Sequence, residues 1–181
     1  EDGSFKEVTE ELGLLYPESM CMGLTVYDFD RDGDLDMFQG NDHQENFMFR
    51  NEGDHFTEVG VEIGVAVNSH GMPTGSMHGA VGDVDGDGHI DLLVSDLRYG
   101  ALYRNLGNGT FEDMTEQSGI AGAFAGKGQW ASALFDYDND GDLDIFSANG
   151  TAEELILQYP LLMENDGKGN FTDVGMDYSP Y

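Results

Sequence analysis

Short runs of apolar and β-branched residues alternate along the chain with glycine-rich turns, and the same order of runs occurs three times. Runs of this length that are bounded by Gly and Asn are typical of strands. The 26 glycines leave little room for long helices, and only residues 7–15 and 153–158 favour a turn or two of helix. Each repeat therefore predicts four strands: one into an acidic loop, one out of it, one before an Asn-X-Gly turn and one after that turn.

The expected strands fall at equivalent places in the three repeats. The first strands are Leu24–Tyr27, Gly79–Gly82 and Ala131–Phe135, and the second strands are Leu35–Gln39, Ile90–Ser95 and Leu143–Ser147. The third strands are Asn46–Arg50, Ala101–Arg104 and Pro160–Glu164. The fourth strands carry a Phe that is followed two residues later by an acidic residue, at Phe56, Phe111 and Phe171, and this signature also occurs at Phe5 within residues 4–8.

The Phe signature recurs at intervals of 51, 55 and 60 residues. Units of about 50 residues with four strands apiece are typical of β-propeller blades. We therefore expect an all-β fold, with three four-stranded blades and a partial repeat in a single segment over residues 1–181. Its repeats lie at about 5–55, 56–110 and 111–170, with a terminal strand at 171–181. Closed propellers have about four to eight blades, so we expect either part of a larger propeller or closure by association with other copies.

The first hairpin of each repeat is predicted to turn through a nine-residue acidic loop, which begins at Asp28, Asp83 or Asp136. All three loops have Asp at positions 1, 3, 5 and 9 and Gly at position 6. So many carboxylates in one loop repel one another unless a cation neutralises them. Calcium takes six to eight oxygen ligands, and the first half of an EF-hand loop has this same spacing. The loops therefore predict about three calcium ions, one for each loop.

The loops are nevertheless not EF-hands, because position 12 holds Gln39, Val94 or Ser147 where a bidentate Glu is needed. Position 9 must then close the site. His89 stands at position 7 of the second loop, which indicates that this position offers its backbone carbonyl. Magnesium prefers a stricter shell with retained water, and zinc prefers His and Cys. The candidate calcium ligands are Asp28, Asp30, Asp32, Asp34, Asp36, Asp83, Asp85, Asp87, His89, Asp91, Asp136, Asp138, Asp140, Asp142 and Asp144.

The pattern Asp-X-Asp-X-Asp-Gly-X-X-Asp, followed by two apolar residues, an Arg-Asn-X-Gly turn and Gly-X-Phe-X-Asp, resembles the FG-GAP or VCBS repeat. Residues 129–144 look especially like the repeats of the ASPIC/UnbV (cartilage acidic protein-like) group, and integrin alpha-type propellers are more distantly similar. The resemblance implies a calcium-binding β-propeller that is secreted or lies at a cell surface, with ligands at positions 1, 3, 5, 7 and 9. His89 departs from the usual Asp, and three repeats are fewer than the family's larger ring needs.

The charge of the chain limits the classes of partner that it can be expected to bind. The formal net charge is −29, with 36 acidic and only seven basic residues, which argues against nucleic acid and anionic membrane surfaces. No apolar run approaches the roughly 20 residues that cross a bilayer, and no leader-like segment stands at the start, so the chain reads as a mature or trimmed product. Weak calcium loops fill where calcium is abundant, which favours an extracellular location. There, Asn108, Asn149 and Asn170 are candidate glycosylation sites.

No residue pattern points to catalysis. The dense Asp pairs all lie in the loops, and the sequence has no Gly-X-Ser-X-Gly or His-Glu-X-X-His motif. The single cysteine, Cys21, cannot form an intrachain disulfide and is expected to be buried. We therefore predict a non-catalytic module for adhesion or for binding a protein or carbohydrate ligand. The alternatives are a structural protein that self-associates into rings or filaments, and a propeller-based enzyme that acts on polysaccharide.

Overall fold

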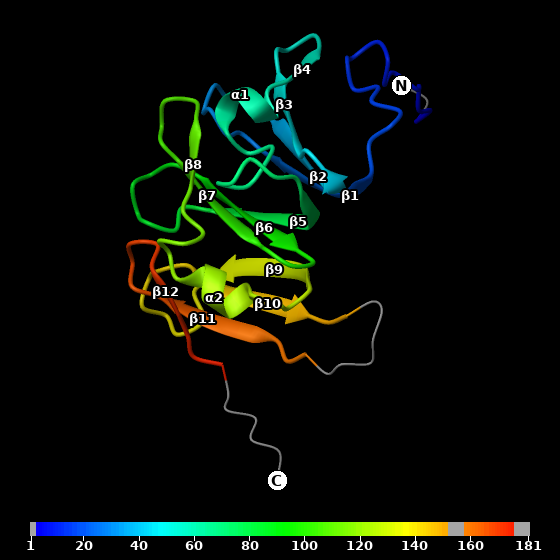
Figure 1. The fold of residues 1–181 in the computed structure, drawn as a ribbon. Coiled ribbons are helices and arrows are strands. Elements are labelled where there is room, and N and C mark those ends of the chain that lie inside the picture. Colours follow the sequence, from blue (N-terminus) through cyan, green and yellow to red (C-terminus); the bar gives the residue numbers. More distant parts are fainter. Residues whose placement is uncertain (1–2, 152–157, 176–181) are drawn as a thin grey trace.

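The computed structural model describes residues 3–151 and 158–175, and this part of the chain has an all-β fold with two very short helices (Figure 1). The strands form three antiparallel four-stranded units that follow one another along the chain. Unit 1 contains β1 (Cys21–Tyr27), β2 (Asp36–Gln44), β3 (Phe47–Asn51) and β4 (Phe56–Glu58). Unit 2 contains β5 (Thr74–Gly82), β6 (Asp91–Asp96), β7 (Ala101–Asn105) and β8 (Phe111–Asp113). Unit 3 contains β9 (Gln129–Phe135), β10 (Asp144–Asn149), β11 (Leu161–Asn165) and β12 (Phe171–Asp173).

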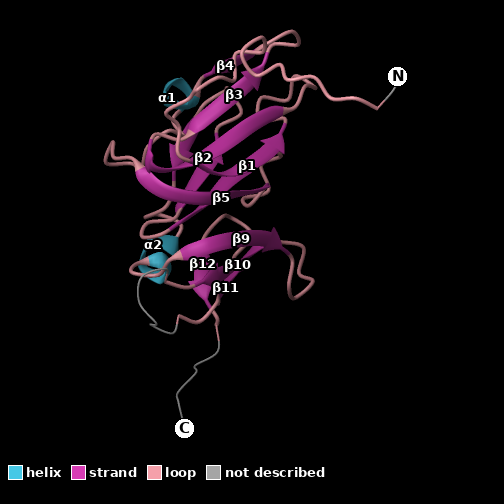
Figure 2. Ribbon diagram, turned by 90° about the vertical axis from the view of Figure 1, so that its right-hand side faces the viewer, coloured by secondary structure: helices cyan, strands magenta, loops and turns pink. Residues whose placement is uncertain are grey.

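All twelve strands lie where the hydrophobic pattern predicts them, with ends that differ by a few residues. Within each unit every strand pairs antiparallel with the next strand along the chain. Units 1 and 2 are also joined, because the end of β2 pairs with the start of β5 at Asp42 and Gly75. Figure 2 shows β1, β2 and β5 side by side, with β9–β12 as a separate sheet below them.

The small-residue turns between units form the two helices, α1 (Gly60–Ile63) and α2 (Ile120–Phe124). These two turns, and the equivalent turn before unit 1, each contain a glycine with positive φ, namely Gly64 (91°), Gly119 (85°) and Gly13 (76°). A Cβ on these glycines would lie 2.7–3.0 Å from the backbone oxygen of the Phe that begins the next fourth strand. Glycine is therefore required twice over, for the left-handed backbone and for this close approach.

The apolar side chains form two cores, and each core fills the junction between two successive units. Phe38 and Leu92 belong to the core between units 1 and 2, together with α1. Leu93 and Ile145 belong to the core between units 2 and 3, together with α2. The successive residues Leu92 and Leu93 of β6 thus point into opposite junctions, as expected for a strand that is buried on both faces. The units are consequently stacked face to face, and the acidic loops are held at one edge of the stack.

Four local expectations were wrong or fall outside the described residues. Residues 4–8 form no strand and Phe5 is fully exposed, because no third strand in the described residues stands beside this segment to pair with it. Cys21 is exposed at the first residue of β1, where the register is irregular. Residues 7–15 form turns without a helix, and residues 152–157 of the second expected helical stretch lie outside the described residues.

Candidate metal centres

The three acidic loops join the first and second strands of their units and have the same internal hydrogen bonds. In each loop the position 6 glycine N–H donates to the position 1 carboxylate, and Gly33 to Asp28 measures 3.0 Å. The position 5 N–H donates to the position 3 carboxylate, and the position 7 N–H donates to the position 5 carboxylate. Gly33 and Gly141 have φ near 100°, which wraps the chain inward. Each loop is therefore a turn that holds alternate carboxylates on one side.

The folded loops bring three carboxylates of each unit close enough to share one ion. Their oxygens lie within 4.8 Å of one another in each of three groups: Asp28, Asp30 and Asp32; Asp83, Asp85 and Asp91; and Asp136, Asp138 and Asp144. In these groups the structure combines positions 1, 3 and 5 of the first loop and positions 1, 3 and 9 of the other two. Asp36, Asp87 and Asp140 belong to the same loops without completing these groups in the described residues.

The chemistry of these groups fits a hard divalent cation. All the converging atoms are carboxylate oxygens, which calcium and magnesium prefer. One oxygen of Asp28 is shielded from solvent and has no hydrogen-bond partner in the described part of the chain. An unpartnered buried oxygen of this kind is costly unless a ligand satisfies it. Asp28 at position 1 of the first loop is therefore a residue around which an ion would be held.

The position 9 carboxylates face inward and connect each loop to the third strand. Asp91 is fully buried; one of its oxygens accepts the Val84 N–H at 2.9 Å and the other accepts the Asn105 N–H at 2.9 Å. The same two bonds occur at Asp36 and at Asp144. Position 9 thus fixes the loop against the Asn-X-Gly turn while it lies next to the candidate metal site.

Burial changes the acidity of these inward-facing groups. Burial raises the pKa of Asp36 to about 6 and that of Asp91 to about 7, against the lowering effect of their backbone hydrogen bonds. Neighbouring Asp residues of the same loops add to the rise. Desolvation also raises the pKa of Asp30 and of Asp138. The carboxyl groups of the metal-free loops therefore ionise less readily than an ordinary Asp. A bound cation would stabilise their ionised forms.

The position 7 side chains lie outside the three groups of carboxylates. His89 lies against the backbone of Gly107, and Asp142 lies against that of Gly167, so that a Cβ on either glycine would collide with the facing side chain. Both glycines belong to the Asn-X-Gly turn of the same unit. The position 7 side chains of Asp34, His89 and Asp142 thus take no part in the clusters, and a backbone carbonyl ligand at this position stays a prediction.

Sequence reasoning missed the role of the asparagine in the Asn-X-Gly turn. The Asn105 side-chain amide donates to the Ile90 carbonyl in its own loop at 3.2 Å and to the Phe29 carbonyl in the loop of unit 1 at 2.8 Å. Asn165 repeats this arrangement one unit later, with Leu143 at 2.9 Å and Val84 at 2.8 Å. The recurrence of Asn before the Phe signatures at Phe56, Phe111 and Phe171 was the available signal. These asparagines link successive acidic loops to one another.

A family model described as FG-GAP-like repeat matches residues 28–94 and again residues 83–147. The chain belongs to the FG-GAP-like repeat family. The two matches each begin at the first Asp of a loop and end in or near the second strand of the following unit. The family assignment therefore rests on the loops and on the junctions between units.

The chain is also similar to human cartilage acidic protein 1, with 22% identity over 175 residues that cover 93% of this chain. It spans about a quarter (26%) of the length of that relative. Together with the family match, this confirms the predicted assignment to FG-GAP repeat proteins of the ASPIC/UnbV group. A solved lectin from Agrocybe aegerita, described as recognising non-reducing terminal N-acetylglucosamine, aligns with a TM-score of 0.48 and 19% identity, covering 82% of this chain and 36% of the lectin chain.

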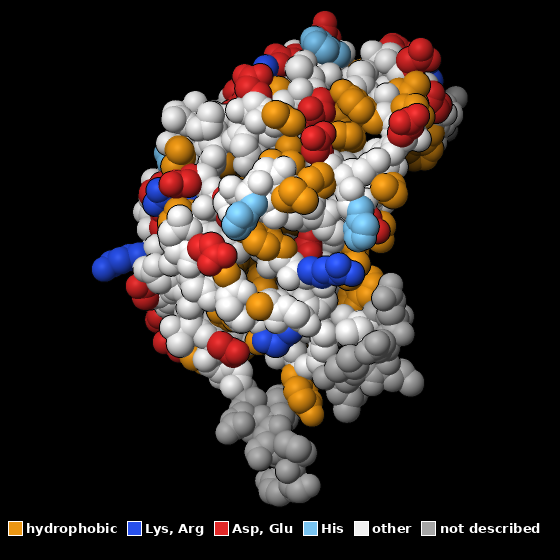
Figure 3. Space-filling view, viewed as in Figure 1, with side chains coloured by type: hydrophobic (Ala, Val, Ile, Leu, Met, Phe, Trp, Pro, Cys, Tyr) orange, Lys and Arg blue, Asp and Glu red, His pale blue; other side chains and the backbone are white. Residues whose placement is uncertain are grey.

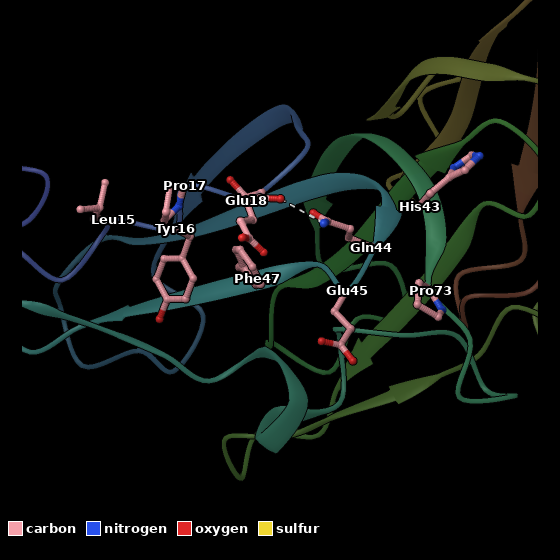
Figure 4. A pocket seen from close by; sticks show the side chains of 10 residues that line it. Leu15, Tyr16, Pro17, Glu18, His43, Gln44, Glu45, Phe47 and Pro73 are labelled. Carbon is pink, nitrogen blue, oxygen red and sulfur yellow. Dashed lines mark hydrogen bonds between the residues drawn. The ribbon is translucent and has the colours of Figure 1, made fainter.

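A hollow of about 570 Å³ lies at the opposite ends of the strands from the acidic loops, where β2 turns into β3 (Figure 4). Tyr16 forms one wall and lies 4.9 Å from Phe47 between ring centroids. Glu18 and Glu45 line the same hollow, and the Gln44 side-chain amide donates to the Glu18 carbonyl at 3.0 Å. Aromatic rings beside carboxylates suit a sugar or a basic side chain.

The visible surface of the FG-GAP chain carries many acidic and few basic side chains (Figure 3). The acidic side chains are spread over all three units in this view, in agreement with the net charge of −29. Among residues 3–151 and 158–175, no helix has both the length and the apolar character that a membrane crossing needs.

Proposed function

We propose that the chain is a calcium-stabilised segment of a β-propeller, with its three units as blades, which binds a protein or carbohydrate ligand outside the cell without catalysis. The observation that carries this proposal is the threefold recurrence of one loop, in which three carboxylates converge within 4.8 Å. Calcium is favoured because the donors are all oxygens and too numerous for the octahedral shell of magnesium. Each ion would be held by positions 1, 3, 5 and 9 and by the position 7 carbonyl.

The ion would act on structure and take no part in a reaction. Each loop joins the first and second strands of a blade, and position 9 connects the loop to the third strand through buried hydrogen bonds. Because clustered carboxylates repel one another, calcium binding would become part of the folding free energy. The extracellular location is supported by the family and by human cartilage acidic protein 1 as a relative. The hollow beside Tyr16 is the candidate ligand site.

Titration calorimetry of the chelator-treated chain tests the metal sites. We expect about three calcium ions per chain and a rise in melting temperature on calcium addition. Asp83→Asn should remove one of these sites, because position 1 is a ligand and accepts the turn N–H as well. Glu116→Gln, an exposed change outside the loops, should leave all of them. Calcium binding that survives triple substitution at Asp28, Asp83 and Asp136 would contradict the proposed sites.

A glycan array and a screen of extracellular proteins test the ligand class, with Tyr16→Ala as the variant that removes one wall of the hollow. We expect binding without turnover. Steady hydrolysis of any polysaccharide in the screen, lost on substitution of an Asp or Glu outside the loops, would favour the enzyme alternative.

A further inference from the structure

A second hollow, of about 390 Å³, lies at the junction between units 1 and 2 and adjoins the hollow beside Tyr16. His43 and Pro73, which Figure 4 labels, line both hollows. The residues that line the second hollow come from the end of β2, from residues 68–75 and from residues 96–99. Units 1 and 2 and the segment that connects them therefore form it together. Its volume is in the range of about 300–1,000 Å³ that is typical of small-ligand sites.

Asp96 is the most buried of the residues that line this hollow, with 2% of its surface exposed. Its Oδ1 atom accepts the N–H groups of Arg98 at 2.6 Å and Tyr99 at 2.8 Å. Its Oδ2 atom is shielded from solvent and has no hydrogen-bond partner in the described part of the chain. A buried carboxylate oxygen that lacks a donor is costly. This atom is thus an acceptor that a ligand would satisfy.

The equivalent residues of units 1 and 3 are asparagines, so the fold itself does not require a carboxylate at this position. Asn41, Asp96 and Asn149 each stand five residues after the last Asp of their loop. The Asn41 amide donates to the Glu45 carbonyl at 2.7 Å. The Asn149 amide donates to the Tyr159 carbonyl at 2.9 Å. Asp96 has no N–H group with which to make this bond, and the carboxylate of unit 2 offers an acceptor where units 1 and 3 have a structural amide.

The second hollow also contains hydrogen-bond donors. Arg98 lines it and is exposed, and a guanidinium group has five N–H donors and no acceptor. The Asn68 side-chain oxygen accepts the N–H groups of His70 and Met72 at 3.0 Å each, so the NH2 group of Asn68 is left to donate. A ligand here must therefore both donate and accept. Hydroxyl groups do both, whereas a cation would lie beside Arg98 and an anion would lie beside Asp96.

We propose that this second hollow binds a sugar residue through its hydroxyl groups. One hydroxyl would donate to Asp96 Oδ2, and others would accept from Arg98 and Asn68. The side chains of Met72 and Tyr99 also line the hollow and supply apolar surface for the C–H groups of the sugar ring. This inference rests on the proposed function, because it assigns the carbohydrate ligand to one defined site and to one buried carboxylate.

Titration of the chain with methyl glycosides of glucose, galactose, mannose and fucose tests the site, with calcium present and NMR of the backbone amides as the readout. At least one glycoside should shift the amide signals of Arg98 and Tyr99, because these N–H groups donate to the Asp96 carboxylate. Asp96→Asn should weaken this binding by at least about tenfold, since it removes a charged acceptor. Its melting temperature should stay the same or rise, because the variant has the residue that units 1 and 3 have.

Two further variants separate this site from the rest of the molecule. Glu116→Gln, the same kind of change at an exposed residue, should leave glycoside binding unchanged. Binding that is lost on Tyr16→Ala and kept on Asp96→Asn would move the ligand to the other hollow, which overturns this inference and leaves the proposed function standing.

Three other results would also overturn the inference. The first is that no glycoside shifts the amide signals of Arg98 and Tyr99. The second is a lower melting temperature for Asp96→Asn, which would give the carboxylate a structural role. The third is that the amide of N-acetyl-lysine, a cation, binds in place of the glycosides and is lost on Asp96→Asn.

Discussion

Metal-free protein should become less stable as the pH rises from about 5 to about 8. Burial raises the pKa of Asp36 to about 6 and that of Asp91 to about 7 in the folded chain, whereas an unfolded Asp has a pKa near 3.9. The folded state therefore binds these protons more tightly than the unfolded state. Their stabilising contribution is complete below the unfolded pKa and is lost as the pH rises through the folded value.

The size of this effect follows from the shifts. One pKa unit corresponds to about 1.4 kcal/mol, so Asp91 contributes at most about 4 kcal/mol and Asp36 at most about 3 kcal/mol. Both side chains are fully buried, so solvent screens them little. A chain of this size loses roughly 2–4 °C in melting temperature for each kcal/mol. Part of this contribution is already lost below pH 5, and about 4 kcal/mol is lost between pH 5 and pH 8. We therefore expect the melting temperature to fall by on the order of 10 °C across this range.

Thermal melts at a series of pH values, with chelator and with saturating calcium, measure this dependence. Calcium requires ionised carboxylates, so its presence should reverse the trend and stabilise the chain toward higher pH. Asp91→Asn should flatten the metal-free profile, and Glu116→Gln should leave it unchanged, because Glu116 is exposed. If the chelated natural chain gained stability from about pH 5 to pH 8, the reasoning from buried carboxylates would be refuted.

Two further predictions concern the links between loops. Asn165→Ala should lower the free energy of unfolding by about 1 kcal/mol more than Asn51→Ala does, because only Asn165 also bonds the Val84 carbonyl of another unit. Urea titrations of both variants measure this difference, and equal losses would contradict the cross-unit bond. Gly107→Ala should destabilise the chain by more than about 1 kcal/mol, since Gly107 has φ of +67° and a Cβ there meets the His89 ring. Thermal melts should show that adding His89→Ala to this variant restores part of the lost stability. No restoration would argue against the contact.

The repeat order of the strands could be predicted from the sequence because each strand is a short apolar run next to a turn with a fixed residue type. The loop geometry was predictable for the same reason: alternate Asp with Gly at position 6 permits few conformations. The pairing of β2 with β5 was not predictable, because it joins Asp42 to Gly75 at an irregular register where neither residue carries a strand pattern. Burial of Cys21 was wrongly expected from residue type alone, since Cys21 begins β1, which pairs with β2 on one side and is an edge strand in the described part of the chain.

The candidate metal sites could be predicted only in part. Sequence spacing identifies the carboxylates, yet it cannot tell which of them face outward together and which face inward. Position 9 differs from the other loop positions because its carboxylate faces inward. Two backbone N–H groups from different parts of the unit donate to each of Asp36, Asp91 and Asp144. The partner in the Asn-X-Gly turn lies 14 to 21 residues further along the chain. Such a contact depends on the folded position of the third strand.

The position of these asparagines couples each candidate metal site to the junction between units. In unit 2, Asp91 belongs to the carboxylate group and accepts the backbone N–H of Asn105. The side chain of Asn105 then bonds the Phe29 carbonyl, which lies between two Asp residues of the first loop. An ion that fixes Asp91 would therefore also fix the asparagine that joins units 1 and 2. If calcium binds in one loop, it would stabilise the contact between units as well as its own hairpin, so metal affinity and stacking of the units should depend on each other.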